Sequence, residues 1–419
     1  MKGITKTIEA IMKNKLFIFL FILLSNLLPA QTFDQYSFKI QGIYGNIIPH
    51  DQHVKALVLN PVTGAEFSVE FQTMNEKPWH QFNGFPIFGV GTVWLNLGNP
   101  AKLGNALAIY PYLCFPLIRT NFLKLNLKAG AGVSYLTKTY FNTNTDLLGN
   151  LLPLDSTNAA ISSNLNVFFS GGGNLEIPLG NGFSLTADYN WNHISNGSIV
   201  VPNSGLNFLN GFVGLKYFPN YKKFKFPTKQ NYQNIPRKFS FEIIASGGFR
   251  QYNYLDQKTY PIGSMVFGVY RPLTNFYRMG LAIDAFYDGV YDGTSLYKRT
   301  YLTTNELKNK IRIGTSWQHE LLLGRLSAGF DFGIYLYDPL KNLSPVNFYT
   351  GQLINSNQNK PLIYPYDIDK NGVQSGEDGW FYSRATLKYA IDNHFFLSIG
   401  LKTHLQKAEF IEWGLGYRL

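Results

Sequence analysis

FSLTADYNWNHIS, residues 183–195, alternates polar and apolar side chains along almost its whole length. Successive side chains of a β-strand point to opposite faces, so this segment predicts a strand with one polar and one apolar face. Residues 122–128, 277–288 and 382–389 alternate in the same way. Strands of about ten residues with this pattern are typical of transmembrane β-barrels, in which the apolar face contacts lipid and the polar face lines the interior.

The composition favours a membrane barrel over soluble, disordered or helical membrane proteins. Charged residues make up 15% of the 419 residues, against about 25% in an ordinary soluble domain. Aromatic residues reach 16%, there are 39 glycines, and the mean hydropathy is only −0.09. A hydrophobic content of 45% is enough to bury a core, which excludes a disordered chain. A membrane helix needs about 20 consecutive apolar residues, and the chain has no such run after residue 30.

The N-terminus has the pattern of an export signal. Several lysines precede an apolar run at 16–28, and the small residue Ala30 follows it. This order predicts a secretory signal peptide over residues 1–30. The alternative, a membrane anchor, is less favoured because the apolar run is short and no stop-transfer pattern follows.

Charge and cysteine content narrow the partners further. The formal net charge of +11 is compatible with the anionic headgroups of a membrane surface. Nucleic acid is not expected as a partner, because no basic cluster carries interleaved aromatic residues in a recognisable module. The single cysteine, Cys114, excludes an internal disulfide framework and a cysteine-based metal site.

About sixteen strand candidates can be placed, eight in residues 31–218 and eight in residues 239–419. Residues 219–238, which are basic and rich in Pro and Asn, predict a linker between them. Both halves end alike, with GLKYF at 214–218 and GLGYRL at 414–419. Outer-membrane barrels typically end on such a strand. We therefore predict an all-β protein, a transmembrane antiparallel β-barrel of two tandem eight-stranded units; the alternative is one sixteen-stranded barrel with a long periplasmic turn.

Two polar residues interrupt the apolar face of the strand at 183–195. His193 and Ser195 occupy its odd positions, so they are neighbours on the face predicted to contact lipid. An unpaired polar pair in lipid is costly unless it lies at the interface. If both termini are periplasmic, this strand end lies at the outer surface. Asn207 shares the apolar parity of the next strand, and a serine beside a histidine base with a third orienting group is the arrangement of an activated ester-cleaving nucleophile.

The motif HxSNG at 193–197, followed by PNxG at 202–205, resembles the signature of the outer-membrane lipid A 3-O-deacylases, also called acyloxyacyl hydrolases. The resemblance implies an eight-stranded barrel over residues 31–218 that removes an ester-linked acyl chain from lipopolysaccharide at its lipid-facing wall. It assigns the nucleophile to Ser195, the base to His193 and an oxyanion donor to Asn196. The third member of the family triad is a glutamate, for which this chain has Asn207; an amide orients an imidazole but cannot stabilise the imidazolium by charge.

These observations predict an outer-membrane ester hydrolase that acts on lipid A in the outer leaflet and needs no cofactor for catalysis. The second half is expected to be non-catalytic, because His404 falls on the inward face of its penultimate strand. The alternative is a non-enzymatic outer-membrane barrel, either a pore or a structural or adhesive protein, in which HxSN is a turn signal. An eight-stranded barrel is too narrow to conduct ions, which makes the pore hypothesis less favoured.

A second motif, DIDKNGVQSGED at residues 367–378, has the spacing of a calcium loop. Oxygen ligands at alternate positions, a glycine at the sharp turn and a closing carboxylate suit a hard cation. The predicted ligands are Asp367, Asp369, Asn371, Val373, Ser375 and Asp378. Aspartate replaces the usual closing glutamate, and no flanking helix is evident. The motif therefore predicts a structural calcium ion, and the alternative is an acidic surface loop on the extracellular side.

Overall fold

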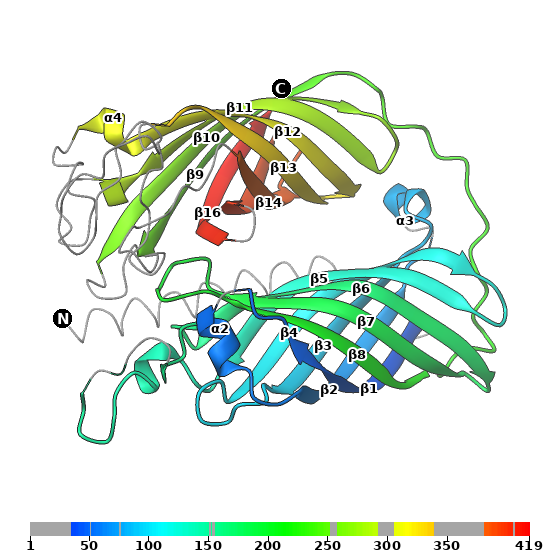
Figure 1. Ribbon diagram of the computed structural model, residues 1–419. Helices are drawn as coiled ribbons and strands as arrows, with labels where there is room; N and C mark the ends of the chain where they lie inside the picture. The colour runs from blue at the N-terminus through cyan, green and yellow to red at the C-terminus, as the bar shows by residue number, and fades with distance from the viewer. Residues whose placement is uncertain are drawn as a thin grey trace.

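The structure is a computed structural model that describes residues 35–50, 52–74, 77–150, 152, 156–251, 258–291, 306–338, 381–404 and 407–419. Its strands form two closed barrels of eight antiparallel strands each (Figure 1). The first closes where β1 pairs with β8, and the second closes where β16 pairs with β9. The prediction of two eight-stranded barrels is confirmed, and the single sixteen-stranded barrel is excluded.

The strands follow one another around each barrel in chain order. The first barrel consists of β1 (Tyr36–Ile47), β2 (Val62–Gln72), β3 (Ile87–Asn96), β4 (Asn105–Arg119), β5 (Lys124–Leu136), β6 (Leu165–Gly180), β7 (Phe183–Ser195) and β8 (Leu206–Tyr217). The second consists of β9 (Ser240–Gln251), β10 (Thr259–Pro272), β11 (Tyr277–Asp288), β12 (Ile311–Leu323), β13 (Leu326–Tyr337), β14 (Phe381–Ala390), β15 (Phe395–His404) and β16 (Lys407–Arg418). Residues 218–239 connect the barrels through turns and irregular chain.

Short helices lie in the connections between strands. They are α2 (Gln52–Leu57), α3 (Pro78–Phe82), η2 (Tyr140–Asn142), η4 (Gly289–Tyr291) and α4 (Leu307–Lys310). In the described part of the chain, no helix is both long and apolar enough to cross a membrane.

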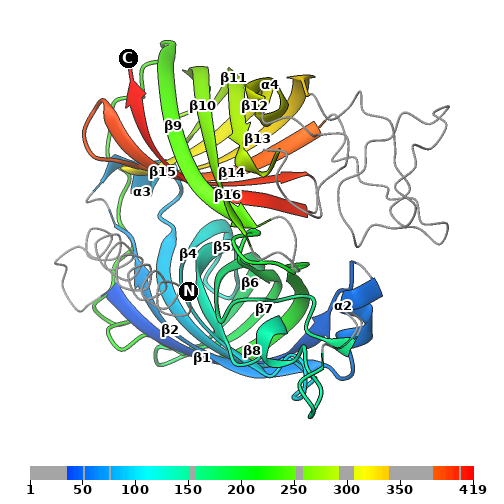
Figure 2. The ribbon, with the colours of Figure 1, turned by 90° about the vertical axis from the view of Figure 1, so that its left-hand side faces the viewer.

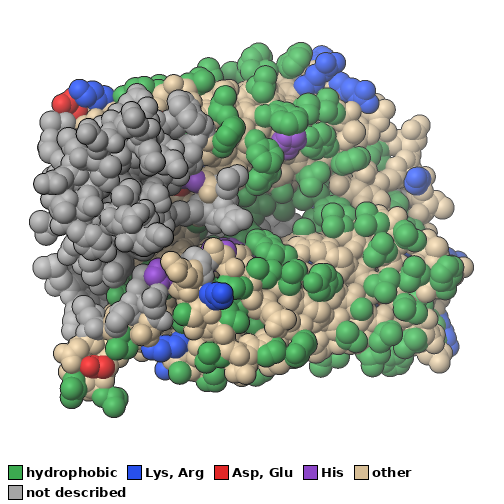
Figure 3. All heavy atoms as spheres, viewed as in Figure 1, with side chains coloured by type: hydrophobic (Ala, Val, Ile, Leu, Met, Phe, Trp, Pro, Cys, Tyr) green, Lys and Arg blue, Asp and Glu red, His purple; other side chains and the backbone are tan. Residues whose placement is uncertain are grey.

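The alternation read from the sequence separates the two faces of each wall. On β7, Tyr189 is 63% exposed on the outside, whereas Asn190 is fully buried on the inside. The second barrel repeats this pattern, with Leu281 exposed and Asp284 buried on β11. Apolar side chains consequently cover much of the outer surface of both barrels (Figure 3). An extended apolar outer surface around a polar interior is the arrangement of a barrel embedded in lipid.

Buried ion pairs fill the interior of the first barrel. Lys128 Nζ lies 3.1 Å from Asp188 Oδ2 and 3.2 Å from Glu66 Oε1. Lys39 Nζ lies 3.4 Å from the same Asp188 oxygen. A buried charge is tolerated only when paired, so these side chains specify one another across the barrel. With its interior occupied in this way, the barrel has the packed character expected of eight strands rather than that of a pore.

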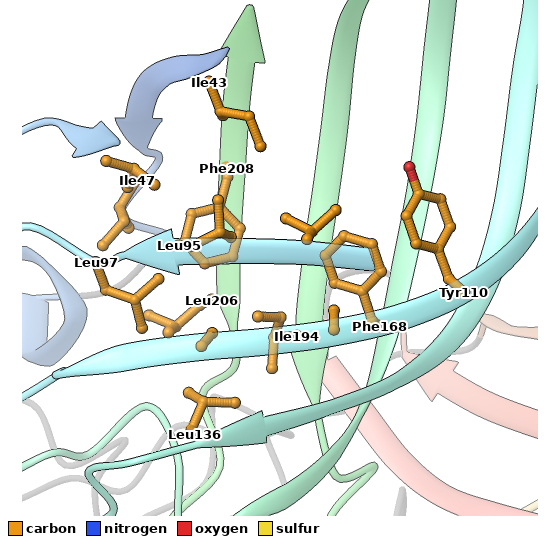
Figure 4. Close-up of a cluster of buried hydrophobic side chains, with 14 of the residues drawn as sticks. Ile43, Ile47, Leu95, Leu97, Tyr110, Leu136, Phe168, Ile194, Leu206 and Phe208 are labelled. Carbon is orange, nitrogen blue, oxygen red and sulfur yellow. The ribbon is translucent and has the colours of Figure 1, made fainter. Parts of the chain in front are cut away.

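Near the C-terminal end of β7, the interior of the first barrel is apolar instead of charged (Figure 4). Ile194, Leu206 and Phe208 are fully buried in this cluster, together with Ile47 at the end of β1. These inward-facing residues alternate with the outward-facing residues of β7 and β8, so burying them fixes the strand ends that carry the candidate site.

The two barrels lie beside each other (Figures 1 and 2), and hydrogen bonds join them at both ends. At one end, Asn83 Nδ2 donates to the carbonyl of Leu322 at 3.3 Å, close to α3. At the other end, Ser198 Oγ donates to the carbonyl of Ala408 at 2.9 Å. The second contact comes from the segment between β7 and β8, which leads directly into the candidate site.

Candidate active site

Strand register brings the predicted site residues together at one end of the first barrel. His193 on β7 pairs with Asn207 on β8. On its other side β8 pairs with β1, and the Ile48 amide just past β1 donates to the Asn207 carbonyl at 2.8 Å. Three neighbouring strand ends therefore contribute to one small area of the outer wall. Closure of the barrel is what brings residues near position 50 within reach of Asn207.

The side chains of Ser195, His193 and Asn207 form a continuous hydrogen-bonded chain. His193 Nε2 lies 2.8 Å from Ser195 Oγ, and its Nδ1 lies 2.7 Å from Asn207 Oδ1. Both distances fit ordinary hydrogen bonds. With the proton on Nδ1 donated to the amide oxygen, Nε2 is left to accept from the serine hydroxyl. This is the tautomer that a general base needs.

Aromatic residues hold the imidazole in place on the outer wall. The His193 ring stacks on Trp191, with centroids 5.7 Å apart and planes at 12°. Phe169 on β6, which pairs with His193 across the sheet, has its ring centroid 6.5 Å away. Stacking on Trp191 restricts the rotation of the imidazole.

Gly205 explains the glycine of the PNxG motif. Its backbone has φ +78°, a conformation that favours glycine. A Cβ at this position would lie 2.9 Å from His193 Cε1 and 3.4 Å from Ser195 Cβ. The backbone thus approaches the candidate base and nucleophile more closely than any other residue type allows.

Asn196 lies beside the nucleophile, but its side chain already has partners. Asn196 Nδ2 donates to Ser163 Oγ and to the Val200 carbonyl, each at 2.9 Å. Its backbone N–H donates to Asn203 Oδ1 at 3.2 Å. The oxyanion role expected of Asn196 stays a prediction, and the geometry gives its side chain a second task, which is to hold the loop.

Asn203 was part of the motif but was not predicted as a functional residue. Its Oδ1 binds the peptide that follows Ser195, whereas its Nδ2 is buried and makes no hydrogen bond within the described part of the chain. A buried donor without a partner is costly.

The segment between Ser195 and Asn207 is also held by the second barrel. Gln251, at the end of β9, donates its backbone N–H to the Ser198 carbonyl at 3.1 Å and accepts from the Val201 amide at 3.0 Å through Oε1. Gly197 packs closely against the Ile411 side chain of β16. No sequence pattern predicts these contacts, because they join residues that are fifty or more positions apart and lie between the two barrels.

The second barrel differs at the equivalent place. His404 faces the interior, where its Nε2 lies 2.7 Å from Glu409 Oε2. The inward orientation predicted for His404 is confirmed. The predicted calcium loop at 367–378 and the predicted signal peptide at 1–30 lie outside the described residues, so both stay predictions.

The two closed barrels with apolar outer surfaces define a membrane β-barrel protein. The first barrel carries a hydrogen-bonded serine–histidine pair, which is an arrangement found in hydrolases. The sequence model for lipid A 3-O-deacylase (PagL) matches residues 63–216, and that for the acyloxyacyl hydrolase C-terminal domain matches residues 239–351 and 366–419. Together these matches span more than half of the chain and reach both barrels. The first barrel thus matches the lipid A 3-O-deacylase family, and the second barrel matches the C-terminal domain of acyloxyacyl hydrolases.

Solved structures give weaker likenesses. The crystal structure of Neisserial surface protein A covers 44% of this chain and 96% of its own, with 12% identity and a TM-score of 0.29. The outer membrane enzyme PagL covers 43% of this chain and 98% of its own, with 16% identity and a TM-score of 0.27. A porin from Rh. blastica covers 92% of this chain and 100% of its own, with 8% identity and a TM-score of 0.18. Scores this low carry no functional argument. No curated protein matches the chain significantly.

Proposed function

We propose that this protein is an outer-membrane esterase that removes an ester-linked acyl chain from lipid A by serine–histidine catalysis on the lipid-facing wall of its first barrel. The observation that carries the proposal is the hydrogen-bonded chain from Ser195 through His193 to Asn207, with distances of 2.8 and 2.7 Å. The match of residues 63–216 to the lipid A 3-O-deacylase model supports the substrate class.

The position of the site suits a substrate held in the outer leaflet. With periplasmic termini, odd-numbered strands run outward, so the end of β7 lies at the outer surface. His193 shares its face with the exposed side chains of Tyr189 and Trp191, whereas Asn192 points into the barrel. A lipid A molecule beside this wall would present its ester bonds at the depth of the serine hydroxyl.

The reaction follows from the proton positions. Ser195 Oγ attacks the ester carbonyl carbon while its proton passes to His193 Nε2, and the carbonyl becomes an oxyanion. Asn207 keeps the proton on His193 Nδ1. When the intermediate collapses, the C–O bond of the ester breaks and His193 returns the proton to the ester oxygen of lipid A, which leaves as an alcohol. Water activated by His193 then hydrolyses the acyl-serine, releasing a fatty acid and restoring the hydroxyl.

Negative charge develops on the former carbonyl oxygen in the transition state. A hydrogen-bond donor that already points at this oxygen lowers the activation barrier. The buried Nδ2 of Asn203, next to the peptide after Ser195, is the donor that we assign to this task, because the side-chain amide of Asn196 is already engaged. Loss of a single oxyanion donor typically costs about 10²- to 10³-fold in kcat.

The second barrel is proposed to be non-catalytic and to support the site from the side. Its inward-facing His404 is paired with Glu409, and its β9 and β16 hold the segment that follows Ser195. By holding this loop, the second barrel would fix the positions of the nucleophile and the oxyanion donor relative to each other.

The test is mass spectrometry of lipid A from cells with and without the protein. We expect lipid A that has lost one ester-linked acyl chain only when the protein is present, together with the free fatty acid. An unchanged acylation pattern would instead favour a structural or adhesive barrel, in which the Ser–His–Asn chain merely satisfies polar groups at a strand end.

A further inference from the structure

His50 lies next to Asn207, immediately beyond β1, and extends the hydrogen-bonded chain by two links. Its Nδ1 lies 3.2 Å from Asn207 Nδ2, and its Nε2 lies 2.7 Å from the backbone carbonyl of Ser204. The position is half-buried. No sequence motif marks this histidine. It reaches the site only because the barrel closes between β1 and β8.

The Ser204 carbonyl determines which atoms donate and which accept in the hydrogen-bonded chain from His50 to Ser195. A carbonyl only accepts hydrogen bonds, so His50 Nε2 must carry a hydrogen and donate it. A neutral imidazole has one N–H, which leaves His50 Nδ1 as an acceptor. This nitrogen accepts from the NH₂ of Asn207, and the Asn207 oxygen then faces His193.

The orientation of the Asn207 amide decides whether His193 can act as a base. With the oxygen toward it, His193 keeps its proton on Nδ1 and offers the lone pair of Nε2 to Ser195. With the NH₂ toward it, the imidazole would accept at Nδ1 and carry its proton on Nε2. That tautomer cannot take the serine proton.

We propose that His50 is a positioning residue that locks the Asn207 amide in the catalytically competent orientation, a role that rests on the proposed esterase function. A glutamate in place of Asn207 would need no such lock, because both of its carboxylate oxygens accept. An amide has one accepting atom and one donating group, so only one of its two orientations places the acceptor toward His193. His50 selects this orientation by accepting a hydrogen bond from the NH₂ group of Asn207.

A pair of near-isosteric substitutions separates the two hydrogen bonds of His50. The terminal atoms of asparagine lie close to the place of Nδ1, so His50→Asn keeps an acceptor for Asn207. Those of glutamine lie close to Nε2, so His50→Gln keeps only the contact with the Ser204 carbonyl. We expect kcat for acyl release to fall about 10- to 100-fold in His50→Gln, the usual cost of losing a residue that orients an active group. His50→Asn should retain most of the activity, and KM should stay close to that of the unmutated protein in both.

The second measurement places His50→Leu in two backgrounds. In the native background the loss of the acceptor should lower kcat by the same factor as His50→Gln. In an Asn207→Glu background it should change kcat by less than about threefold, because the lock is no longer required. A merely structural role for His50 would produce the same loss in both backgrounds.

All variants are assayed as full-length protein in detergent micelles with purified lipopolysaccharide, and the released fatty acid is quantified by mass spectrometry. Circular dichroism confirms the β-structure of each variant. If the unmutated protein releases no fatty acid beyond the Ser195→Ala level, the esterase proposal itself fails. If it is active but His50→Asn and His50→Gln do not differ, or if His50→Leu costs the same in both backgrounds, only the role of His50 is overturned.

Discussion

The two barrels share strand count, closure and a buried charged interior, but they differ at the end of the penultimate strand. On β7 of the first barrel, His193 points outward beside Ser195 and bonds to it. On β15 of the second barrel, His404 points inward and bonds to Glu409. Side chains alternate along a strand, so a shift of one position moves a histidine from the wall to the core.

The same barrel scaffold therefore gives a histidine different surroundings, depending on which face of the strand it occupies. The interior histidine joins a buried ion-pair network, in which Lys402 also contacts Glu409. The outward histidine instead contacts a hydroxyl, an amide and two aromatic rings. The same residue type thus joins an ion-pair network in one barrel and a serine–histidine–asparagine hydrogen-bonded chain in the other.

The largest expected effect comes from removing the hydroxyl that distinguishes the first barrel. Ser195→Ala should lower acyl release by several orders of magnitude, because only the residual catalysis of the surrounding site remains. The control is Ser383→Ala, which removes a hydroxyl from β14 of the second barrel, where Ser383 bonds to Thr403. It should leave the rate of acyl release unchanged.

Both variants are assayed with purified lipopolysaccharide after their thermal unfolding has been compared. Undiminished release by Ser195→Ala would remove Ser195 from the reaction. A loss in Ser383→Ala equal to that in Ser195→Ala would contradict the assignment of chemistry to the first barrel alone.

The next effect concerns the amide that departs from the family pattern. Asn207→Glu should raise kcat, because a carboxylate accepts the Nδ1 proton and stabilises the imidazolium that forms. Exchanging carboxylate for amide in a serine-protease triad costs about 10⁴-fold, which is the upper scale of the gain. A lipid-facing carboxylate is costly to desolvate, so the observed gain should be smaller. Asn207→Ala should lower kcat, and if neither change moves it, another residue orients His193.

A smaller effect tests whether the second barrel supports the site of the first. Gln251→Ala removes the acceptor of the Val201 amide, whose distance to Gln251 Oε1 is 3.0 Å. One hydrogen bond contributes about 0.5–1.5 kcal/mol net, so kcat should fall about 2- to 10-fold. Gln251→Glu keeps an accepting oxygen and should retain the rate. Equal rates for all three proteins would show that the barrels are functionally independent.

Much of the fold followed from the sequence because strand alternation is a local property. The alternation at 183–195 placed Tyr189, Trp191 and Asp188 on their observed faces, and the repeated ending at 214–218 anticipated two barrels. Pairing between first and last strands is not local. The contact of His50 with Asn207 therefore depends on closure, which no short motif encodes.

The candidate site was likewise predictable only where its residues are close together in the sequence. Residues two positions apart on one strand, such as His193 and Ser195, are brought together by geometry alone. The roles of Asn196 and Asn203 depend on which amide hydrogens are already bonded, and this is set by a loop that folds against Ser163 and the second barrel. Helix α3 and its contact near Leu322 gave no periodic signal because five residues are too few to show one.

The smallest effect concerns a feature predicted for the second barrel only, the calcium loop at 367–378. If it binds calcium, the metal stabilises the folded protein by mass action, by about 2.7 kcal/mol when free calcium is a hundredfold above the Kd. Asp367→Ala should then lower Tm in calcium but leave Tm in chelator unchanged. The control, Asp392→Ala, removes a carboxylate that accepts from the backbone amides of His394 and Phe395, each at 2.7 Å. That loss should lower Tm equally in calcium and in chelator, because the turn contains no metal ligand. Melting curves of the unmutated protein that coincide with and without calcium would remove the site and leave an acidic loop.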